Sequence, residues 1–177
     1  MLPSVSTLSN NILNLPITSN KNEGVANFVT VIANFMNQIQ AGSSGSPGIL
    51  TFGNEAMISV LLQQNVVGNN SWVTNFVNAW QQGILAGTIT PGTVTNPAWI
   101  TSAVDVATLS SPGSTITTLS EATDILNSEL LSISYKNNPP MPLAQAIYDA
   151  AMQLSFTCIG LGPPPSSAPI PIPFSAQ

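Results

Sequence analysis

The sequence contains no histidine and no arginine, and it has a single cysteine, Cys158. Imidazole acid-base catalysis and the usual pairing of a nucleophile with a histidine base are therefore excluded. A metal site built from cysteine and histidine is excluded for the same reason. Cys158 cannot form a disulfide within the chain, so the fold does not depend on an oxidising compartment. We expect no enzymatic activity, no cofactor and no bound metal ion.

Charge is also scarce, because charged residues make up only 5% of the 177 residues against a usual share of about 25%. Two lysines and a net charge of -5 cannot neutralise a row of phosphates, which argues against nucleic-acid binding and against a polybasic membrane contact. Asn, Gln, Ser and Thr supply the polar surface instead. Such a surface has little charge repulsion to hold neighbouring copies apart.

Long apolar runs are missing as well, and none approaches the roughly 20 residues that a membrane-spanning helix requires. The first residues, 1–4, lack the basic start and the apolar run of a signal peptide. Apolar residues nevertheless make up 44% of the chain, which is more than a disordered protein contains. We expect one folded domain without a transmembrane helix.

The periodicity of the apolar residues predicts an all-α fold with a compact, bundle-like core of five to six helices in residues 20–161. The strongest signal is a helix over 20–41, with Asn20 and Glu23 as a capping box and Gly42 as its end. A second capping box is expected at Thr118 and Glu121. The other predicted helices cover 52–65, 71–86, 97–110, 118–135 and 142–159. A small β-hairpin is predicted at 88–95, around a Pro-Gly pair.

A short N-terminal arm, residues 1–19, precedes this core. Val5, Leu8 and Ile12 recur there at steps of three and four, which predicts a helix of about two and a half turns. A helix of that length is marginal alone. It must therefore lie on its own core or on a neighbouring subunit.

An extended proline-rich tail, residues 162–177, follows the core. Its prolines favour polyproline II and exclude a helix, and the apolar residues Ile170, Ile172 and Phe174 alternate with the last three prolines. Apolar extensions at both ends of a small core can gain affinity by ordering on a neighbour's surface. We therefore predict that six residues bind a partner: Val5, Leu8, Ile12, Ile170, Ile172 and Phe174.

Two groups of residues allow a second interpretation. Glu121 and Asp124 lie three apart, as a carboxylate pair for glycoside hydrolysis or Mg²⁺ binding would, but acids in a first turn also stabilise the helix dipole, which we favour. Lys136 lies beside Ser134 and Tyr135, so a Ser-Lys dyad is an alternative to a lysine that stabilises a helix end.

An aromatic stripe presents a further choice. Trp72, Phe76 and Trp80 are spaced by four residues, so they could stack sugar rings on an exposed helix face or pack inside the core. Val73 and Val77 flank the same face, which favours burial.

These features together favour a non-enzymatic structural component of a large protein assembly, held by apolar and neutral polar contacts and by its terminal extensions. The expected setting is a virus or phage particle, and the expected location is the virion, as a minor capsid or cementing protein or as a tail or connector element. Its partners would be other structural proteins and copies of itself. The alternatives are an extracellular or cell-surface module that contacts carbohydrate and a helical carrier of an apolar ligand.

Overall fold

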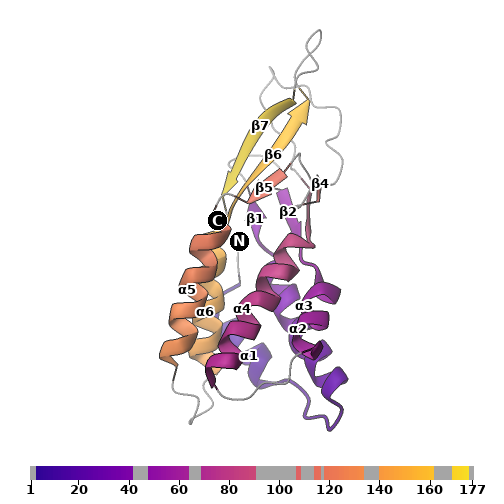
Figure 1. Ribbon diagram of the computed structural model, residues 1–177, viewed down its shortest axis with the longest axis vertical. Helices are drawn as coiled ribbons and strands as arrows, with labels where there is room; N and C mark the ends of the chain where they lie inside the picture. Colours follow the sequence, from indigo (N-terminus) through magenta and orange to yellow (C-terminus); the bar gives the residue numbers. More distant parts are fainter. Residues whose placement is uncertain are drawn as a thin grey trace.

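The chain folds into a body of helices with β-structure at one end, as the computed structural model in Figure 1 shows. The structure describes residues 3–41, 48–63, 69–90, 107–108, 114–116, 118–133, 140–161 and 169–175. Six helices occur in these ranges: α1 (Val5–Leu13), α2 (Lys21–Met36), α3 (Asn54–Gln63), α4 (Asn69–Leu85), α5 (Leu119–Ser132) and α6 (Pro140–Met152). The predicted helical core is confirmed.

The core between these helices is closely packed and draws apolar side chains from all six. Phe76 and Trp80 of α4 are fully buried, and the ring of Phe76 lies 5.9 Å from that of Phe28 on α2. Phe35 of α2 lies 6.3 Å from Tyr148 of α6, measured between ring centroids. Aromatic contacts therefore link α2 to α4 and to α6.

The start of α2 is capped as the sequence predicts. The side-chain oxygen of Asn20 accepts hydrogen bonds from the backbone N–H groups of Asn22 at 3.0 Å and Glu23 at 3.5 Å. In a capping box the Glu23 side chain would bond to the backbone N–H of Asn20. Here Thr18 connects the two: its hydroxyl donates to the Glu23 carboxylate at 2.8 Å and accepts from the Asn20 N–H at 3.1 Å. The predicted direct bond from Glu23 to the cap is therefore replaced by a relay.

The end of α2 differs from the prediction, since the helix stops at Met36 and not at Gly42. Asn37 follows as the C-cap, and its side-chain oxygen accepts the backbone N–H of Phe52 at 2.6 Å. The chain then enters a strand, β1 (Gln40–Ala41). The helix thus ends six residues before the glycine, next to a tertiary hydrogen bond from Phe52 to Asn37.

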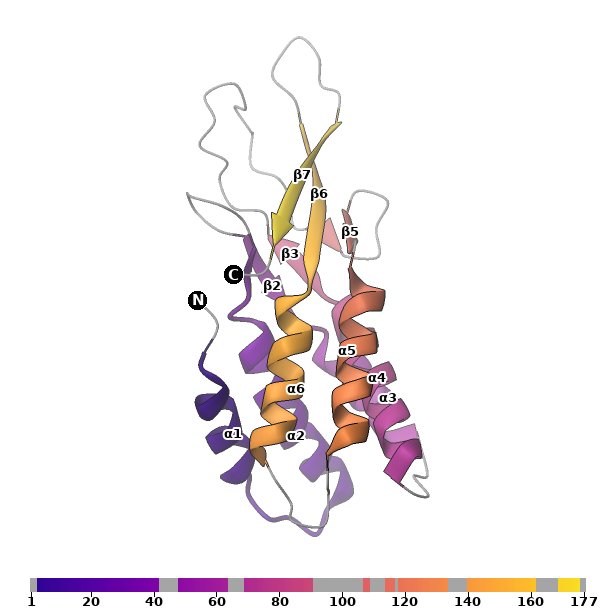
Figure 2. The same cartoon turned by 90° about the vertical axis from the view of Figure 1, so that its left-hand side faces the viewer.

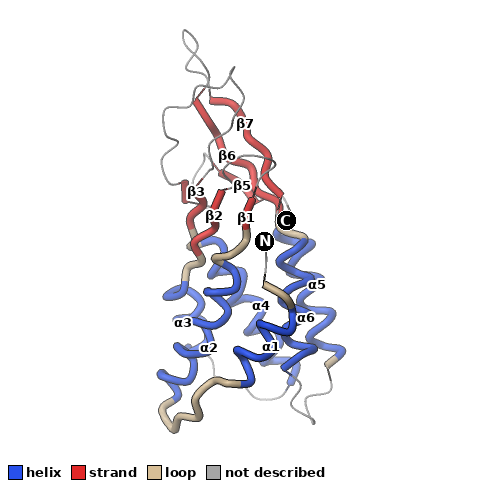
Figure 3. The backbone as a smooth tube through the Cα atoms, turned by 180° about the vertical axis from the view of Figure 1, so that it is seen from behind, coloured by secondary structure: helices blue, strands red, loops and turns tan. Residues whose placement is uncertain are grey.

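Two antiparallel sheets lie at the same end of the helices (Figures 1 and 3). The first contains β1, β2 (Gly48–Thr51), β3 (Thr88–Thr90) and β4 (Ala107–Thr108), in that order. The second contains β5 (Ser114–Ile116), β6 (Ser155–Leu161) and β7 (Pro169–Ser175), in that order. The backbone of β7 also contacts that of β1, which brings the two sheets together.

These sheets account for most differences from the predicted elements. The last helix ends at Met152, and the segment predicted to continue it to 159 forms β6. The tail is extended, as expected, but it pairs as strand β7 and is not a free polyproline II segment. Within the predicted hairpin at 88–95, β3 pairs with β2 and β4, while residues 91–95 lie outside the described ranges. The predicted helix at 97–110 lies outside them except at 107–108, where the chain forms strand β4 and not a helix.

Candidate functional site

The three predicted partner-binding residues of the N-terminal arm lie on α1, which packs against α6 and α2 of its own chain. Ser4 caps this helix, because its side chain accepts the N–H of Thr7 at 3.3 Å. Leu8 is only 1% exposed, and Val5 and Ile12 are partly buried against the same core. The apolar face of the arm is therefore covered within the chain.

The three predicted partner-binding residues of the tail lie on β7. Ile170, Ile172 and Phe174 stand opposite Gly160, Cys158 and Phe156 of β6 in the antiparallel register. The prolines at 169, 171 and 173 alternate with them. The backbone of the tail is therefore also engaged within the chain, and the two predicted groups belong to separate parts of the fold.

The exposed apolar side chains that the structure reveals are different ones. Leu13 is 66% exposed, Ile17 is fully exposed at 104%, and Leu131 and Met141 are about half exposed. They lie at the end of α1, between α1 and α2, at the end of α5 and at the start of α6. Figure 2 shows that these ends point away from the sheets. We call these four residues the distal apolar group.

The sequence does carry a signal for the distal apolar group. Leu13 directly follows Ile12 and so falls off the apolar stripe of α1, and Ile17 follows Pro16, which cannot continue that helix. The sequence does not show which neighbours cover the rest of the stripe, so Leu13 and Ile17 cannot be told from core residues by pattern alone. The packing of α1 in the structure shows that both lie outside the core.

The aromatic stripe of α4 belongs to the core, as favoured from the sequence. Phe76 and Trp80 are fully buried, and Trp72 stacks on Phe76 with 5.4 Å between ring centroids. The indole N–H of Trp80 finds no hydrogen-bond partner among the described residues. Phe76 and Trp80 therefore offer no face on which a sugar ring could stack, whereas Trp72 is only partly buried.

The two candidate carboxylates lie on the surface of α5. Glu121 and Asp124 are exposed in the first turns of α5, where the helix dipole stabilises acids.

Burial, and secondly the negative charge of Asp149, raises the pKa of Glu129 above its ordinary value of 4.5. The two oxygens of the Asp149 carboxylate in turn accept hydrogen bonds from the Gln145 amide, at 2.9 and 2.8 Å. Across the described part of the chain, no three acidic, cysteine or histidine side chains gather as metal ligands would.

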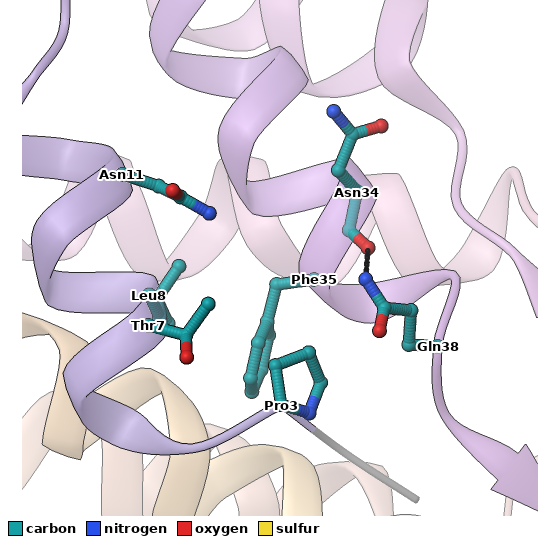
Figure 4. Close-up of a pocket in the computed structure, with 7 residues that line it drawn as sticks. All are labelled: Pro3, Thr7, Leu8, Asn11, Asn34, Phe35 and Gln38. Carbon is teal, nitrogen blue, oxygen red and sulfur yellow. Dashed lines mark hydrogen bonds between the residues drawn. The ribbon is translucent and has the colours of Figure 1, made fainter.

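A small pocket lies between α1 and α2 (Figure 4). Its free volume is about 40 Å³, and its lining is Pro3, Thr7, Leu8, Asn11, Asn34, Phe35 and Gln38. The Gln38 amide donates to the Asn34 carbonyl at 3.1 Å along one wall. A space of this size holds a water molecule or two, whereas ligand pockets measure roughly 300–1,000 Å³.

The candidate Ser-Lys dyad lies outside the described residues, as do Ser134, Tyr135 and Lys136 individually. Cys158 is part of β6 and not of a helix. No helix within the described ranges is both long and apolar enough to cross a membrane.

Comparisons with protein-family models, with curated proteins and with solved structures find no match to this chain. The candidate site is therefore defined by the geometry of the chain alone. That geometry offers exposed apolar side chains at the distal end and two hydrogen-bonded sheets at the other end.

Proposed function

We propose that this chain is a non-enzymatic structural component of a large protein assembly. The observation that carries the proposal is the distal apolar group, which lies on a molecule with very few charged side chains. Covering a large aliphatic side chain contributes about 1.5–3 kcal/mol when it becomes fully buried. Several such side chains at one end of the molecule, with little charge repulsion around them, favour association with other protein chains.

The setting that we propose is a virus or phage particle, in which the chain serves as a minor capsid or cementing protein or as a tail or connector element. An elongated helical body with β-structure at one end (Figure 1) can pack lengthwise beside identical copies. A surface made polar by Asn, Gln, Ser and Thr suits such close packing because it needs few counter-charges. Electron microscopy of particles from the native source, with antibody labelling of this chain, tests this setting.

The alternative binding functions receive less support from the described residues. Carbohydrate stacking on the α4 stripe would need Phe76 and Trp80 at the surface, and both are fully buried. A carrier of an apolar ligand would need a cavity far larger than the 40 Å³ pocket between α1 and α2. We therefore do not propose either function.

The proposal is tested by measuring molar mass with light scattering over a range of protein concentrations. We expect the unmodified chain to form oligomers, and we expect a variant with Leu13→Gln, Ile17→Gln and Met141→Gln to shift toward the monomer without losing helical far-UV signal. Met152→Gln is the matched control, because this exposed methionine lies at the opposite end of α6 from Met141. A chain that remains monomeric at every concentration, and also with candidate partners from its source, would overturn the proposal.

A further inference from the structure

The outermost strand of the second sheet, β7, has proline at every second position. Its seven residues pair with the seven residues of β6, from Ser155 opposite Ser175 to Leu161 opposite Pro169. Within the described sheet, β6 lies between β5 and β7, so the other edge of β7 is not paired with any described strand, although β1 of the first sheet comes close to β7.

A hydrogen bond at the first residue of β6 shows which edge of β7 the proline nitrogens face. The N–H of Ser155 donates to the Thr118 hydroxyl at 2.9 Å, and Thr118 comes two residues after the last residue of β5. The Ser155 N–H therefore points toward the β5 side of β6, away from β7. In an antiparallel pair the residues alternate between pairs that exchange both backbone bonds and pairs that exchange none. Ser155 and Ser175 thus form a non-bonded pair.

The alternation then assigns every other pair in the register. Counting by twos from Ser155 and Ser175, the prolines at 173, 171 and 169 all fall in non-bonded pairs. Because residues in non-bonded pairs make no backbone bond to β6, the missing N–H groups of the prolines do not weaken this ladder. The residues that remain for bonding to β6 are Phe174, Ile172 and Ile170, each of which has an N–H.

We propose that β7 is a one-sided strand, which binds β6 through 170, 172 and 174 and presents an outer edge that a further strand cannot join. From 169 to 173 this outer edge carries carbonyl acceptors but no N–H donor. An arriving strand would find no donor at three alternate positions in succession, and proline on an edge strand is known to prevent strand addition. This inference rests on the proposed function and refines it: copies of the chain do not assemble by extending this sheet.

The test compares two full-length variants that each replace three prolines by threonine. In the first, the prolines at 169, 171 and 173 are replaced; in the matched control, those at 163, 164 and 165, which lie outside β7, are replaced. We expect the first variant to self-associate at a lower protein concentration than the unmodified chain and to increase thioflavin fluorescence. The reason is that its outer edge now has backbone N–H donors. We expect the control variant to behave as the unmodified chain does. Equal association of all three proteins would overturn the inference.

Amide hydrogen exchange in dilute solution gives a second, direct readout. In the unmodified chain, the amides of Ile170, Ile172 and Phe174 should exchange slowly. In the single variant Pro171→Thr, which changes one position and guards against misfolding of the triple variant, the new amide at 171 should exchange quickly. A protected amide at 171 beside fast exchange at 170 and 172 would reverse the assignment. Because this readout concerns monomers, it stands or fails independently of whether the chain forms an assembly.

Discussion

The ring of Phe52 lies directly on Gly83, so close that a Cβ atom at position 83 would come within 2.1 Å of the Phe52 Cζ atom. The neighbouring Gly53 N–H donates to the Gly83 carbonyl at 2.7 Å. Phe52 is itself buried, and its N–H is held by Asn37 at the end of α2. The ends of α2 and α4 and the start of α3 therefore meet around one glycine.

We expect Gly83→Ala to destabilise the fold, because neither the buried ring nor the hydrogen-bonded backbone can move away without disturbing the core. The expected loss in the free energy of unfolding is about 1–3 kcal/mol, the usual effect of overpacking. Gly24→Ala is the control, since its Cβ would meet only the Thr18 methyl group at an ordinary 3.4 Å. In that helix interior, alanine should stabilise by up to about 1 kcal/mol. Urea unfolding measures both, and equal stability of the two variants would contradict this account.

Thr118 joins the start of α5 to the end of α6. Its hydroxyl donates to the Gln153 carbonyl and accepts the Ser155 N–H, at the point where α6 gives way to β6. We expect Thr118→Val, which keeps the shape but removes both bonds, to lower the free energy of unfolding by about 1–3 kcal/mol. Thr118→Ser should retain most of the stability.

The control for Thr118 is Thr123→Val on the same helix. The Thr123 hydroxyl donates only to the Ser120 carbonyl one turn earlier, so its loss should change the stability by less than about 0.5 kcal/mol. Chemical unfolding together with amide exchange at Ser155 distinguishes the two sites. Unchanged protection of the Ser155 amide in Thr118→Val would count against the proposed connection.

The two leucines of α1 should respond in opposite ways to truncation. Leu8 is buried against the chain's own core, so Leu8→Ala should lower the free energy of unfolding by about 2–5 kcal/mol. Leu13 is largely exposed, so Leu13→Ala should leave the stability nearly unchanged and weaken self-association instead. Thermal unfolding and light scattering on the same samples separate the two effects. A large stability loss for Leu13→Ala would remove that residue from the distal apolar group.

The helices were predictable because their signals are local. Asn20, three positions before Glu23 and ahead of a run of apolar residues at steps of three and four, specifies where α2 begins. The burial of Phe76 and Trp80 follows from the valines that share their face. These inferences need only the helical period and one cap, both of which lie within a single stretch of chain.

The features that could not be predicted depend on residues far apart in the sequence. Thr118 is the N-cap residue, but its side chain makes no capping bond, because the hydroxyl is engaged 35 and 37 residues away. The predicted capping box of Thr118 with Glu121 is therefore wrong. Asn37 likewise falls inside the predicted helix at 20–41, but it is the C-cap of α2 and its side chain accepts the N–H of Phe52, 15 residues away. No periodicity shows either partner.

The strand β6 shows how two signals can compete in one segment. Leu154 and Cys158 continue the helical spacing of α6, yet Phe156, Thr157 and Ile159 are residues that favour strands. The ladders with β5 and β7 decide the outcome, although the prolines of β7 predict polyproline II for that segment. The alternate spacing of those prolines was the unused signal, since it leaves one complete edge for pairing.

A last prediction concerns the pH dependence of stability, through Glu129 of α5. Burial and the nearby charge of Asp149 raise the pKa of Glu129, so above about pH 4.5 the folded chain holds this proton more tightly than the unfolded chain does. The stabilisation is complete at lower pH and is lost as the pH rises through the folded-state pKa. Glu129→Gln should therefore stabilise the fold at pH 7 more than at pH 4 in urea titrations. Glu121→Gln, which removes an exposed acid from the first turn of the same helix, should instead destabilise slightly at pH 7; equal responses of the two variants would refute the assignment.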